Sequence, residues 1–347
     1  MATIDVTVRG GGIFGLACAW ECARRGARVR LIETVRIGAG SSGGLVGALA
    51  PHVPEQWNAK KQFQLESLLM AEAFWAGVAA AGGEDPGYAR LGRWQPVADN
   101  EALALARARA EGAAQLWQGR AVWQVVRQED AGDWAPVSPA GWLIRDTLTA
   151  RLSPRRGGAA LVAAIRAKGG EVVLGDAPEE GLVIHATGVA GLAELSAALG
   201  RTVGDAVKGQ AAILALDARD RPQIFADGLH IVPHGDGTVA IGSTSERTYG
   251  APDTTDGQLE ALIVRARAVC PALAGAPVIE RWAGLRPRAQ SRAPMLGPWP
   301  GRTGHFVANG GFKIGFGMAP RVGAVMADLV LEGRDAVPQG FRVEDSL

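Results

Sequence analysis

Residues 4 to 33 read IDVTVRGGGIFGLACAWECARRGARVRLIE, and this stretch decides the fold. The alternating run at 4–8 predicts a strand, "LACAWECARR" predicts a helix, and "RVRLIE" predicts a second strand that ends at Glu33. Between the first strand and the helix, Gly10, Gly12 and Gly15 have the spacing G-x-G-x-x-G. This order of strand, glycine turn, helix, strand and acid is typical of a dinucleotide-binding βαβ unit.

Each part of this motif has its own physical task. Gly10 permits the tight turn, Gly12 lets the backbone approach a pyrophosphate, and Gly15 lets the helix pack on the strand. The helix N-terminus offers free N–H groups and a positive dipole end to the phosphates. Glu33 can accept hydrogen bonds from ribose hydroxyls and would repel a 2′-phosphate, which disfavours NADP. The residues expected to hold the dinucleotide here are Gly10, Gly12, Ile13, Phe14, Gly15, Glu33 and Thr34.

The next stretch, GAGSSGGLVGALAPH at 38–52, favours FAD over NAD. It contains five glycines and two serines, whereas an NAD domain would run on into a second crossover helix. The serines can donate hydrogen bonds to phosphate or ribityl oxygens, and the small or apolar residues 47–49 let the backbone pass a flat ring. A solvated glycine loop is the alternative interpretation. The expected FAD contacts are Ser41, Ser42, Gly43, Gly47, Ala48 and Leu49.

The composition excludes several classes of protein. The chain has 347 residues, of which 48% are hydrophobic and 20% charged, so it can bury a large core. A net charge of +1 gives no electrostatic case for nucleic acid or an acidic membrane. The three cysteines and five scattered histidines have no metal-ligand spacing, so no metal site is expected. Without a signal-type start or an unbroken apolar run, the expectation is a soluble cytoplasmic protein with no membrane span.

The rest of the chain alternates between two kinds of pattern. Residues 60–82 predict an amphipathic helix, and 159–175 predict a helix, a glycine turn and a strand that returns to a parallel sheet. The strand in EGLVIHATG (180–188) ends in a turn of small residues, where Ala186, Thr187 and Gly188 are expected beside the cofactor. Residues 207–216 and 229–246 predict antiparallel strands, and 253–273 contain a helix.

These patterns predict an α/β (α+β) fold with two intertwined domains and the active site between them. A Rossmann-like FAD-binding domain is expected to comprise residues 1–85, 143–205 and 284–347. An antiparallel-sheet substrate domain is expected to comprise 86–142 and 206–283. Five of the ten tryptophans fall at 94–142, where they form either the core of the substrate domain or the roof of an apolar active site.

Two C-terminal segments carry the candidate substrate-binding cations. ERWAGLRPRAQSRAPMLGP at 280–298 contains Arg286, and GGFKIGFGMAP at 310–320 contains Lys313. With GGGIFGLACAW, GAGSSGGLVGALAP, VIHATG, VKGQ and HIVPHGDGTVAIGSTSE in this order and spacing, the sequence resembles the FAD-dependent amine and amino-acid oxidases of the D-amino acid oxidase superfamily. The glycine oxidase branch is the most similar, with a GFK segment that resembles sarcosine oxidases.

The resemblance implies roles for both cations. Arg286 would hold the substrate carboxylate with its planar fork, and Lys313 would be the second carboxylate contact. A structural ion pair and a solvated loop cation are the alternatives for these two side chains. A helix starting at Pro320 would direct its positive end to the flavin. Three further arginines, Arg281, Arg288 and Arg292, are expected at the surface or behind the site. The residues expected beside the flavin are Gly311, Phe312, Ile314, Gly315 and Phe316.

The sequence departs from the resembled families in three places. Lys313 stands where glycine oxidases have an arginine, the β excursion before the ATG turn is cut to GDAPEEG, and there are only two tyrosines. No cysteine lies between Arg286 and Lys313, where sarcosine oxidases link their flavin, so non-covalent FAD is expected.

The reaction implied by the resemblance is oxidation of the C–N bond of a small amino acid or secondary amine, of the glycine, sarcosine or D-amino acid type. Hydride passes to flavin N5, and the imine product hydrolyses in water. Oxygen or another acceptor would reoxidise the flavin, so both an oxidase and a dehydrogenase fit. The alternatives are a flavin oxidoreductase acting on a modified tRNA base, an NAD-dependent dehydrogenase, and a non-catalytic FAD-binding subunit.

Overall fold

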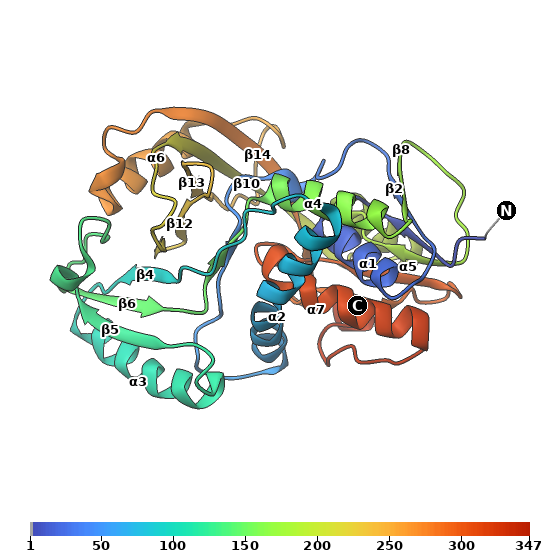
Figure 1. Ribbon diagram of the computed structural model, residues 1–347, viewed down its shortest axis with the longest axis horizontal. Coiled ribbons are helices and arrows are strands. Elements are labelled where there is room, and N and C mark those ends of the chain that lie inside the picture. Colours follow the sequence, from blue (N-terminus) through green and yellow to red (C-terminus); the bar gives the residue numbers. More distant parts are fainter. Residues whose placement is uncertain (1–2) are drawn as a thin grey trace.

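The computed structural model describes residues 3–347. These residues form two large β-sheets with helices packed around them (Figure 1). The six-stranded sheet has the order β15-β16-β9-β1-β2-β8, in which only β15 runs antiparallel to its neighbour. This arrangement confirms the predicted βαβ start and the predicted return to a parallel sheet. Its strands are β1 (Val6–Arg9), β2 (Val29–Glu33), β8 (Glu171–Leu174), β9 (Leu182–His185), β15 (Met295–Pro298) and β16 (His305–Asn309).

Helices pack around this sheet, because apolar stripes on the helices and apolar strand faces bury one another. The helix after the glycine turn, α1, packs against α7, and at Gly323 the contact is so close that a Cβ atom there would lie 2.7 Å from the carbonyl oxygen of Ala17. The N-terminus of α2 is capped by Asn58, whose side chain accepts a hydrogen bond from the Lys61 amide at 3.1 Å. These helices are α1 (Ile13–Arg24), α2 (Ala59–Gly82), α4 (Pro154–Ala167), α5 (Gly188–Leu199) and α7 (Gly315–Glu332).

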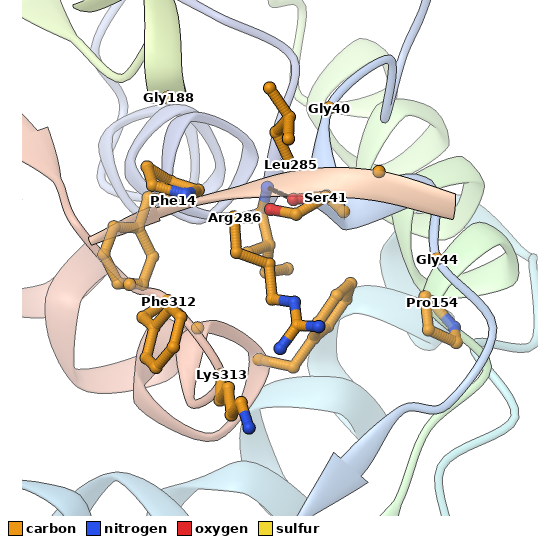
Figure 2. Close-up of a pocket in the computed structure, with 18 of the residues that line it drawn as sticks. Phe14, Gly40, Ser41, Gly44, Pro154, Gly188, Leu285, Arg286, Phe312 and Lys313 are labelled. Atoms are coloured by element: carbon orange, nitrogen blue, oxygen red, sulfur yellow. Dashed lines mark hydrogen bonds between the residues drawn. The ribbon is translucent and has the colours of Figure 1, made fainter. Parts of the chain in front are cut away.

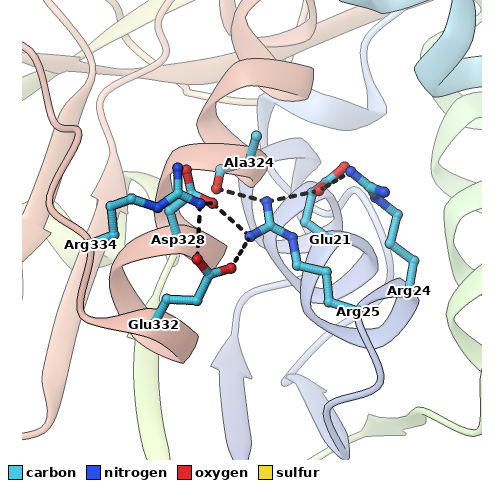
Figure 3. Close-up of polar contacts among 7 residues, drawn as sticks. All are labelled: Glu21, Arg24, Arg25, Ala324, Asp328, Glu332 and Arg334. Carbon is cyan, nitrogen blue, oxygen red and sulfur yellow. Dashed lines mark hydrogen bonds and ion pairs between the residues drawn. The ribbon is translucent and has the colours of Figure 1, made fainter.

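An ion-pair network ties the C-terminal end of α1 to the C-terminal end of α7 (Figure 3). Arg25 donates to Asp328 at 2.6 Å and lies 3.5 Å from Glu21, while Arg24 and Arg334 add further pairs to the same two carboxylates. Glu21 is 1% exposed and Asp328 is 6% exposed. Buried carboxylates require such partners, so the network fixes the two helices whose N-termini face the cofactor region.

The eight-stranded sheet has the order β14-β10-β13-β12-β11-β4-β6-β5 and is antiparallel except for the β11–β4 pair. The long strands β10 and β14 extend toward the six-stranded sheet and contact α5 (Figure 1). Its strands are β4 (Arg93–Pro96), β5 (Trp123–Arg127), β6 (Trp142–Asp146), β10 (Gly204–Ala215), β11 (Gln223–Ala226), β12 (Leu229–Pro233), β13 (Thr238–Gly242) and β14 (Val278–Ala289). The elements that complete the fold are α3 (Asn100–Trp117), α6 (Gly257–Val269), β3 (Ala48–Leu49) and β7 (Ala150–Arg151).

The tryptophans of residues 94–142 belong to the core, as the first of the two interpretations expected. Trp94, Trp117, Trp123 and Trp134 are buried, and the rings of Trp117 and Trp123 pack edge to face with centroids 6.2 Å apart. Trp142 is half-buried, with the guanidinium of Arg127 4.1 Å from its ring centre. None of the five lines the large cavity described below, so the roof interpretation is wrong for them.

Two boundaries differ from the sequence expectations. Helix α7 begins at Gly315, so the predicted start at Pro320 is wrong; proline lies inside the helix and removes the amide that would bond to the carbonyl of Phe316. The two-domain division stays a prediction. Its borders at residues 143 and 284 fall inside β6 and β14, both of which belong to the eight-stranded sheet.

Helix α2 is long and apolar enough to cross a membrane when judged by length and composition alone. In this structure its apolar face packs against α7 and α4, with Phe63, Leu68 and Trp75 in the main core. Core helices of folded proteins have the same length and composition, so α2 is part of the core here.

Candidate active site

One cavity of about 1880 Å³ is lined by residues from both sheets. Pockets for small ligands usually measure roughly 300–1,000 Å³, so this cavity has room for a dinucleotide and a further small molecule. The glycine turn and Glu33 line one part of it, and Arg286 and Lys313 line another. The cavity therefore contains both halves of the site that the sequence predicted.

Close backbone contacts allow only glycine at Gly10 and Gly15 of the turn. Gly10 has a φ of +105°, and a Cβ atom there would lie 2.8 Å from the carbonyl carbon of Ala186 and closer still to its oxygen. A Cβ atom on Gly15 would collide with the carbonyl of Gly10. Gly15 does not line the cavity; it acts by letting α1 approach β1, which is the role the sequence motif predicted.

Glu33 holds the glycine turn in place while it faces the cavity. Its Oε2 accepts a hydrogen bond from the amide of Gly11 at 2.7 Å, and its Oε1 accepts one from the amide of Val35 at 2.9 Å. The side chain is 9% exposed. Each carboxylate oxygen has a second lone pair, so Glu33 can also accept from ribose hydroxyls.

The N-terminus of α1 is the predicted phosphate site, and Ser42 contacts it. Its Oγ accepts a hydrogen bond from the amide of Ile13 at 2.9 Å. Nearby, the hydroxyl of Thr187 is buried without a hydrogen-bond partner, and Thr187 also lines the cavity. A dinucleotide would supply acceptors to the amides and to this hydroxyl, so the residues present fit FAD.

Most of the predicted cofactor residues line the cavity, and the exceptions have simple causes. Leu49 is fully buried in the core because it follows Ala48 in β3, and successive strand residues face opposite sides. Gly43 lines a smaller neighbouring cavity of about 650 Å³. The residues brought together in the large cavity are Gly10, Gly12, Ile13, Phe14, Glu33, Thr34, Ser41, Ser42, Gly47, Ala48, Ala186, Thr187, Gly188, Gly311, Phe312, Ile314, Gly315 and Phe316.

Arg286 is a buried cation with unused hydrogen-bonding capacity. It lies on β14, is 6% exposed, and its Nη2 donates to the carbonyl of Thr244 at 2.6 Å. Its Nη1 is buried without a partner, and within residues 3–347 no carboxylate lies at ion-pair distance. Burial lowers the pKa of Arg286 to about 10, with the charge of Glu246 opposing, so the guanidinium stays protonated at neutral pH.

Lys313 reaches the same part of the cavity because its turn is attached to β14. The amide of Phe312 donates to the carbonyl of Pro287 at 3.0 Å. The ring centre of Phe312 lies 5.8 Å from the Arg286 guanidinium and 5.7 Å from Lys313 Nζ. Figure 2 shows the terminal nitrogens of both side chains pointing to the same side of the cavity. Partial enclosure and then the charge of Arg286 lower the pKa of Lys313.

The three neighbouring arginines are at or near the surface, and Arg281 also lines the rim of the cavity. Arg281 is exposed and pairs with Glu260 at 3.1 Å, Arg288 is half-buried 3.7 Å from Asp205, and Arg292 is exposed. Across residues 3–347, no group of three or more histidine, cysteine, aspartate or glutamate side chains is arranged to hold a metal ion.

The lining residues that were not singled out from the sequence include a group of four: Arg93, Gln95, Phe225 and His230. They come from β4, β11 and β12, which lie side by side in the eight-stranded sheet. The sequence "RWQ" indicates part of this group, because Arg93 and Gln95 alternate around a tryptophan and so place two polar side chains on one face of a strand.

Comparison with known proteins defines the class. Residues 5–329 match the family model DAO, described as FAD dependent oxidoreductase, so the chain belongs to this family of FAD-dependent oxidoreductases. The cofactor is therefore FAD and not NAD, and the family match agrees with the resemblance found in the sequence motifs.

The individual relatives are distant, and some of them cover nearly the whole chain. A glycine oxidase from Pseudomonas putida (strain KT2440) is 28% identical over 94% of each chain. A glycine oxidase from Pseudomonas aeruginosa is 34% identical over 132 residues, 38% of this chain and 36% of that enzyme. The crystal structure of iminodiacetate oxidase from Chelativorans sp. BNC1 has the same fold, with a TM-score of 0.86 and 21% identity over 97% of this chain and 98% of that one.

Proposed function

We propose that this protein oxidises the C–N bond of a small amino acid or secondary amine whose carboxylate is held by Arg286 and Lys313. The observation that carries the proposal is the buried Nη1 of Arg286, which has no partner and lies beside a second cation in the FAD cavity. A buried charge without a counter-ion is costly, and a substrate carboxylate would supply both the charge and the missing acceptors.

The two cations would orient the substrate for the reaction. The planar fork of Arg286 suits two carboxylate oxygens, and Lys313 would contact the same group as a point charge. Bound FAD supplies the hydride acceptor. The hydride leaves the carbon next to nitrogen and carries both electrons of the C–H bond. As that C–H bond breaks, the nitrogen lone pair forms the C=N bond. Water then adds to the imine, which breaks down to a carbonyl compound and an amine or ammonia.

The names of the relatives support this substrate class. The Pseudomonas putida relative is named glycine oxidase, and the solved structure is named iminodiacetate oxidase. A net charge of +1 does not favour binding of tRNA, which makes the modified-base alternative the weaker proposal. We expect the enzyme to work in the cytoplasm as a soluble protein, with oxygen or another electron acceptor as its second substrate.

The test is a spectrum of the purified protein, followed by anaerobic addition of glycine, sarcosine, and the D- and L-forms of alanine and proline. Bleaching of the flavin band by at least one of these compounds is the expected result. A protein that carries FAD but stays oxidised with every amine would instead be a non-catalytic FAD-binding subunit.

A further inference from the structure

The cavity continues past Arg286 and Lys313 to a second group of side chains, which we call the distal subsite: Arg93, Gln95, Phe225 and His230. Arg93 and Gln95 alternate on β4 and so project from one face of the sheet. Phe225 and His230 are opposite partners in the β11–β12 pair, with ring centroids 4.6 Å apart. The guanidinium of Arg93 lies 5.4 Å from the ring centre of Phe225, so Arg93, Phe225 and His230 form one cluster, and Gln95 lines the same cavity from the Arg93 face of β4.

The strand register places the distal subsite on the same face as Arg286. His230 is opposite Gly242, Gly242 is opposite Ala211, and Ala211 is opposite Trp282. Opposite residues of neighbouring strands share a face, and Trp282 and Arg286 are four residues apart on β14. The charges of both Arg93 and Lys313 act on His230, which is consistent with a position between the two groups.

The distal subsite carries polar atoms that the protein does not satisfy. Gln95 Nε2 and His230 Nδ1 are buried without hydrogen-bond partners. Arg93 is 4% exposed and uses its Nε for Asp146 at 2.8 Å, while among residues 3–347 neither of its Nη atoms has a protein acceptor. Buried polar groups are normally paired, so the free donors of Arg93 and Gln95, joined by His230 Nδ1 when that nitrogen carries the ring proton, indicate a ligand with acceptor oxygens.

We propose that the distal subsite binds a second carboxylate, and that the substrate is therefore an amino dicarboxylate. This inference rests on the proposed function, in which the first carboxylate lies between Arg286 and Lys313. The charges agree with a dianion: Arg286 and Lys313 have no counter-ion at ion-pair distance in the described chain, whereas Asp146 balances Arg93. The distal carboxylate would thus be recognised by hydrogen-bond donors and by the excess positive charge of the cavity.

The first test measures binding without turnover. The oxidised holoenzyme is titrated with malonate, succinate and glutarate, and in parallel with propionate, butyrate and valerate, and the shift of the flavin absorbance is followed. At least one dicarboxylate should bind about tenfold or more tightly than the monocarboxylate of the same chain length, the size expected for hydrogen bonds to a charged group. Equal affinities for every matched pair would overturn the proposal.

Two variants assign the effect to these side chains. Gln95→Met removes an amide donor and His230→Phe removes the ring nitrogens, while both keep a similar volume and leave the Arg93–Asp146 pair intact. Both should reduce the ratio of dicarboxylate to monocarboxylate affinity by about tenfold. The matched control is Arg145→Met, on the neighbouring strand β6, because Arg145 is exposed and lies over Trp94 on the other face. An unchanged ratio in both subsite variants would contradict the assignment.

A second test separates this inference from the proposed function. Anaerobic flavin reduction is measured with iminodiacetate and both enantiomers of aspartate and glutamate, against glycine, sarcosine and alanine, with asparagine and glutamine as neutral analogues. A clear preference for one dicarboxylate supports both proposals. Reduction by monocarboxylates or amides at least as fast as by any dicarboxylate overturns the distal carboxylate and leaves the proposed function standing. Tight dicarboxylate binding without reduction by any amine supports the subsite and refutes the proposed function.

Discussion

The guanidinium of Arg286 occupies the space that a side chain at residue 209 would need. A Cβ atom built on Gly209 would lie 2.7 Å from Arg286 Nε and closer still to Cζ and Nη2. The two residues are on neighbouring strands, β10 and β14, with Gly209 directly opposite Gly284. Glycine at 209 therefore leaves room for the guanidinium of Arg286 against β10.

Gly209→Ala should displace the guanidinium and disable substrate binding without removing the charge. We expect normal FAD content and a loss of flavin-reduction efficiency close to that of Arg286→Ala, because the fork can no longer reach the same position. Stopped-flow reduction kinetics measure the effect. Gly275→Ala is the matched control, since a Cβ atom there meets open space. Wild-type kinetics in Gly209→Ala would contradict the role given to this contact.

Glu33→Ala should weaken FAD binding while the fold persists. The carboxylate accepts hydrogen bonds from the amides of Gly11 and Val35 and lines the cavity where we expect the ribose, and bonds to a charged group are worth about 1.5–3 kcal/mol. FAD affinity should therefore fall roughly tenfold to 150-fold in a titration of the apoprotein. Glu171→Ala on the adjacent strand removes only an exposed pair with Arg30 and should leave the affinity unchanged. An unaltered dissociation constant in Glu33→Ala would count against the ribose assignment.

The flavin should come off the protein intact. The three cysteines, Cys18, Cys22 and Cys270, are buried and do not line the cavity. Burial raises the pKa of the Cys22 thiol to about 12 and that of Cys270 to about 11, which suppresses the thiolate that a covalent link would need. Acid precipitation should leave the yellow colour in the supernatant, and colour retained in the pellet would refute non-covalent binding.

Stability should fall as the pH drops below about 6.5. Burial lowers the pKa of His185 to about 4 and that of His230 to about 3, below the value near 6.5 expected in the unfolded chain. The unfolded chain then binds protons first, so stability is complete above pH 6.5 and decreases toward pH 4, by at most about 1.4 kcal/mol per pH unit for each imidazole. Urea unfolding at pH 7.5, 6 and 5 measures this slope.

His185→Phe provides the matched control for that slope. The ring of His185 packs edge-on against Trp299 with centroids 4.8 Å apart, and phenylalanine keeps this packing without a titrating group. The variant should lose less stability between pH 6.5 and 5 than the native chain. The same slope in both proteins would show that His185 does not titrate on unfolding.

The local parts of the site could be predicted from sequence because their geometry depends on a few adjacent residues. The glycine spacing and Glu33 lie within one βαβ unit, so their positions follow from the motif itself. Arg286 and Lys313 lie on separate segments, and family resemblance was needed to connect them. Their common position depends on the hydrogen bond between Phe312 and Pro287, which no local pattern encodes.

The distal subsite was missed because strand register brings its members together. Arg93 and His230 are 137 positions apart in sequence and meet only through β11, which lies between β4 and β12. The small and apolar residues 47–49 predict a backbone that passes a flat ring, and sequence alone does not show that β3 alternates its faces and turns the Leu49 side chain into the core.

The central claim is that Arg286 anchors a substrate carboxylate, and the anaerobic rate of flavin reduction in Arg286→Ala tests it most directly. The variant should keep its FAD and its oxidised spectrum. Its reduction efficiency with the best α-amino acid should fall by roughly thirtyfold to several-thousandfold, the equivalent of about 2–5 kcal/mol for truncating one partner of a buried charge pair. Arg286→Lys should rescue little, since a point charge does not reproduce the fork. Wild-type reduction kinetics in Arg286→Ala would contradict the account and indicate an amine substrate without a carboxylate.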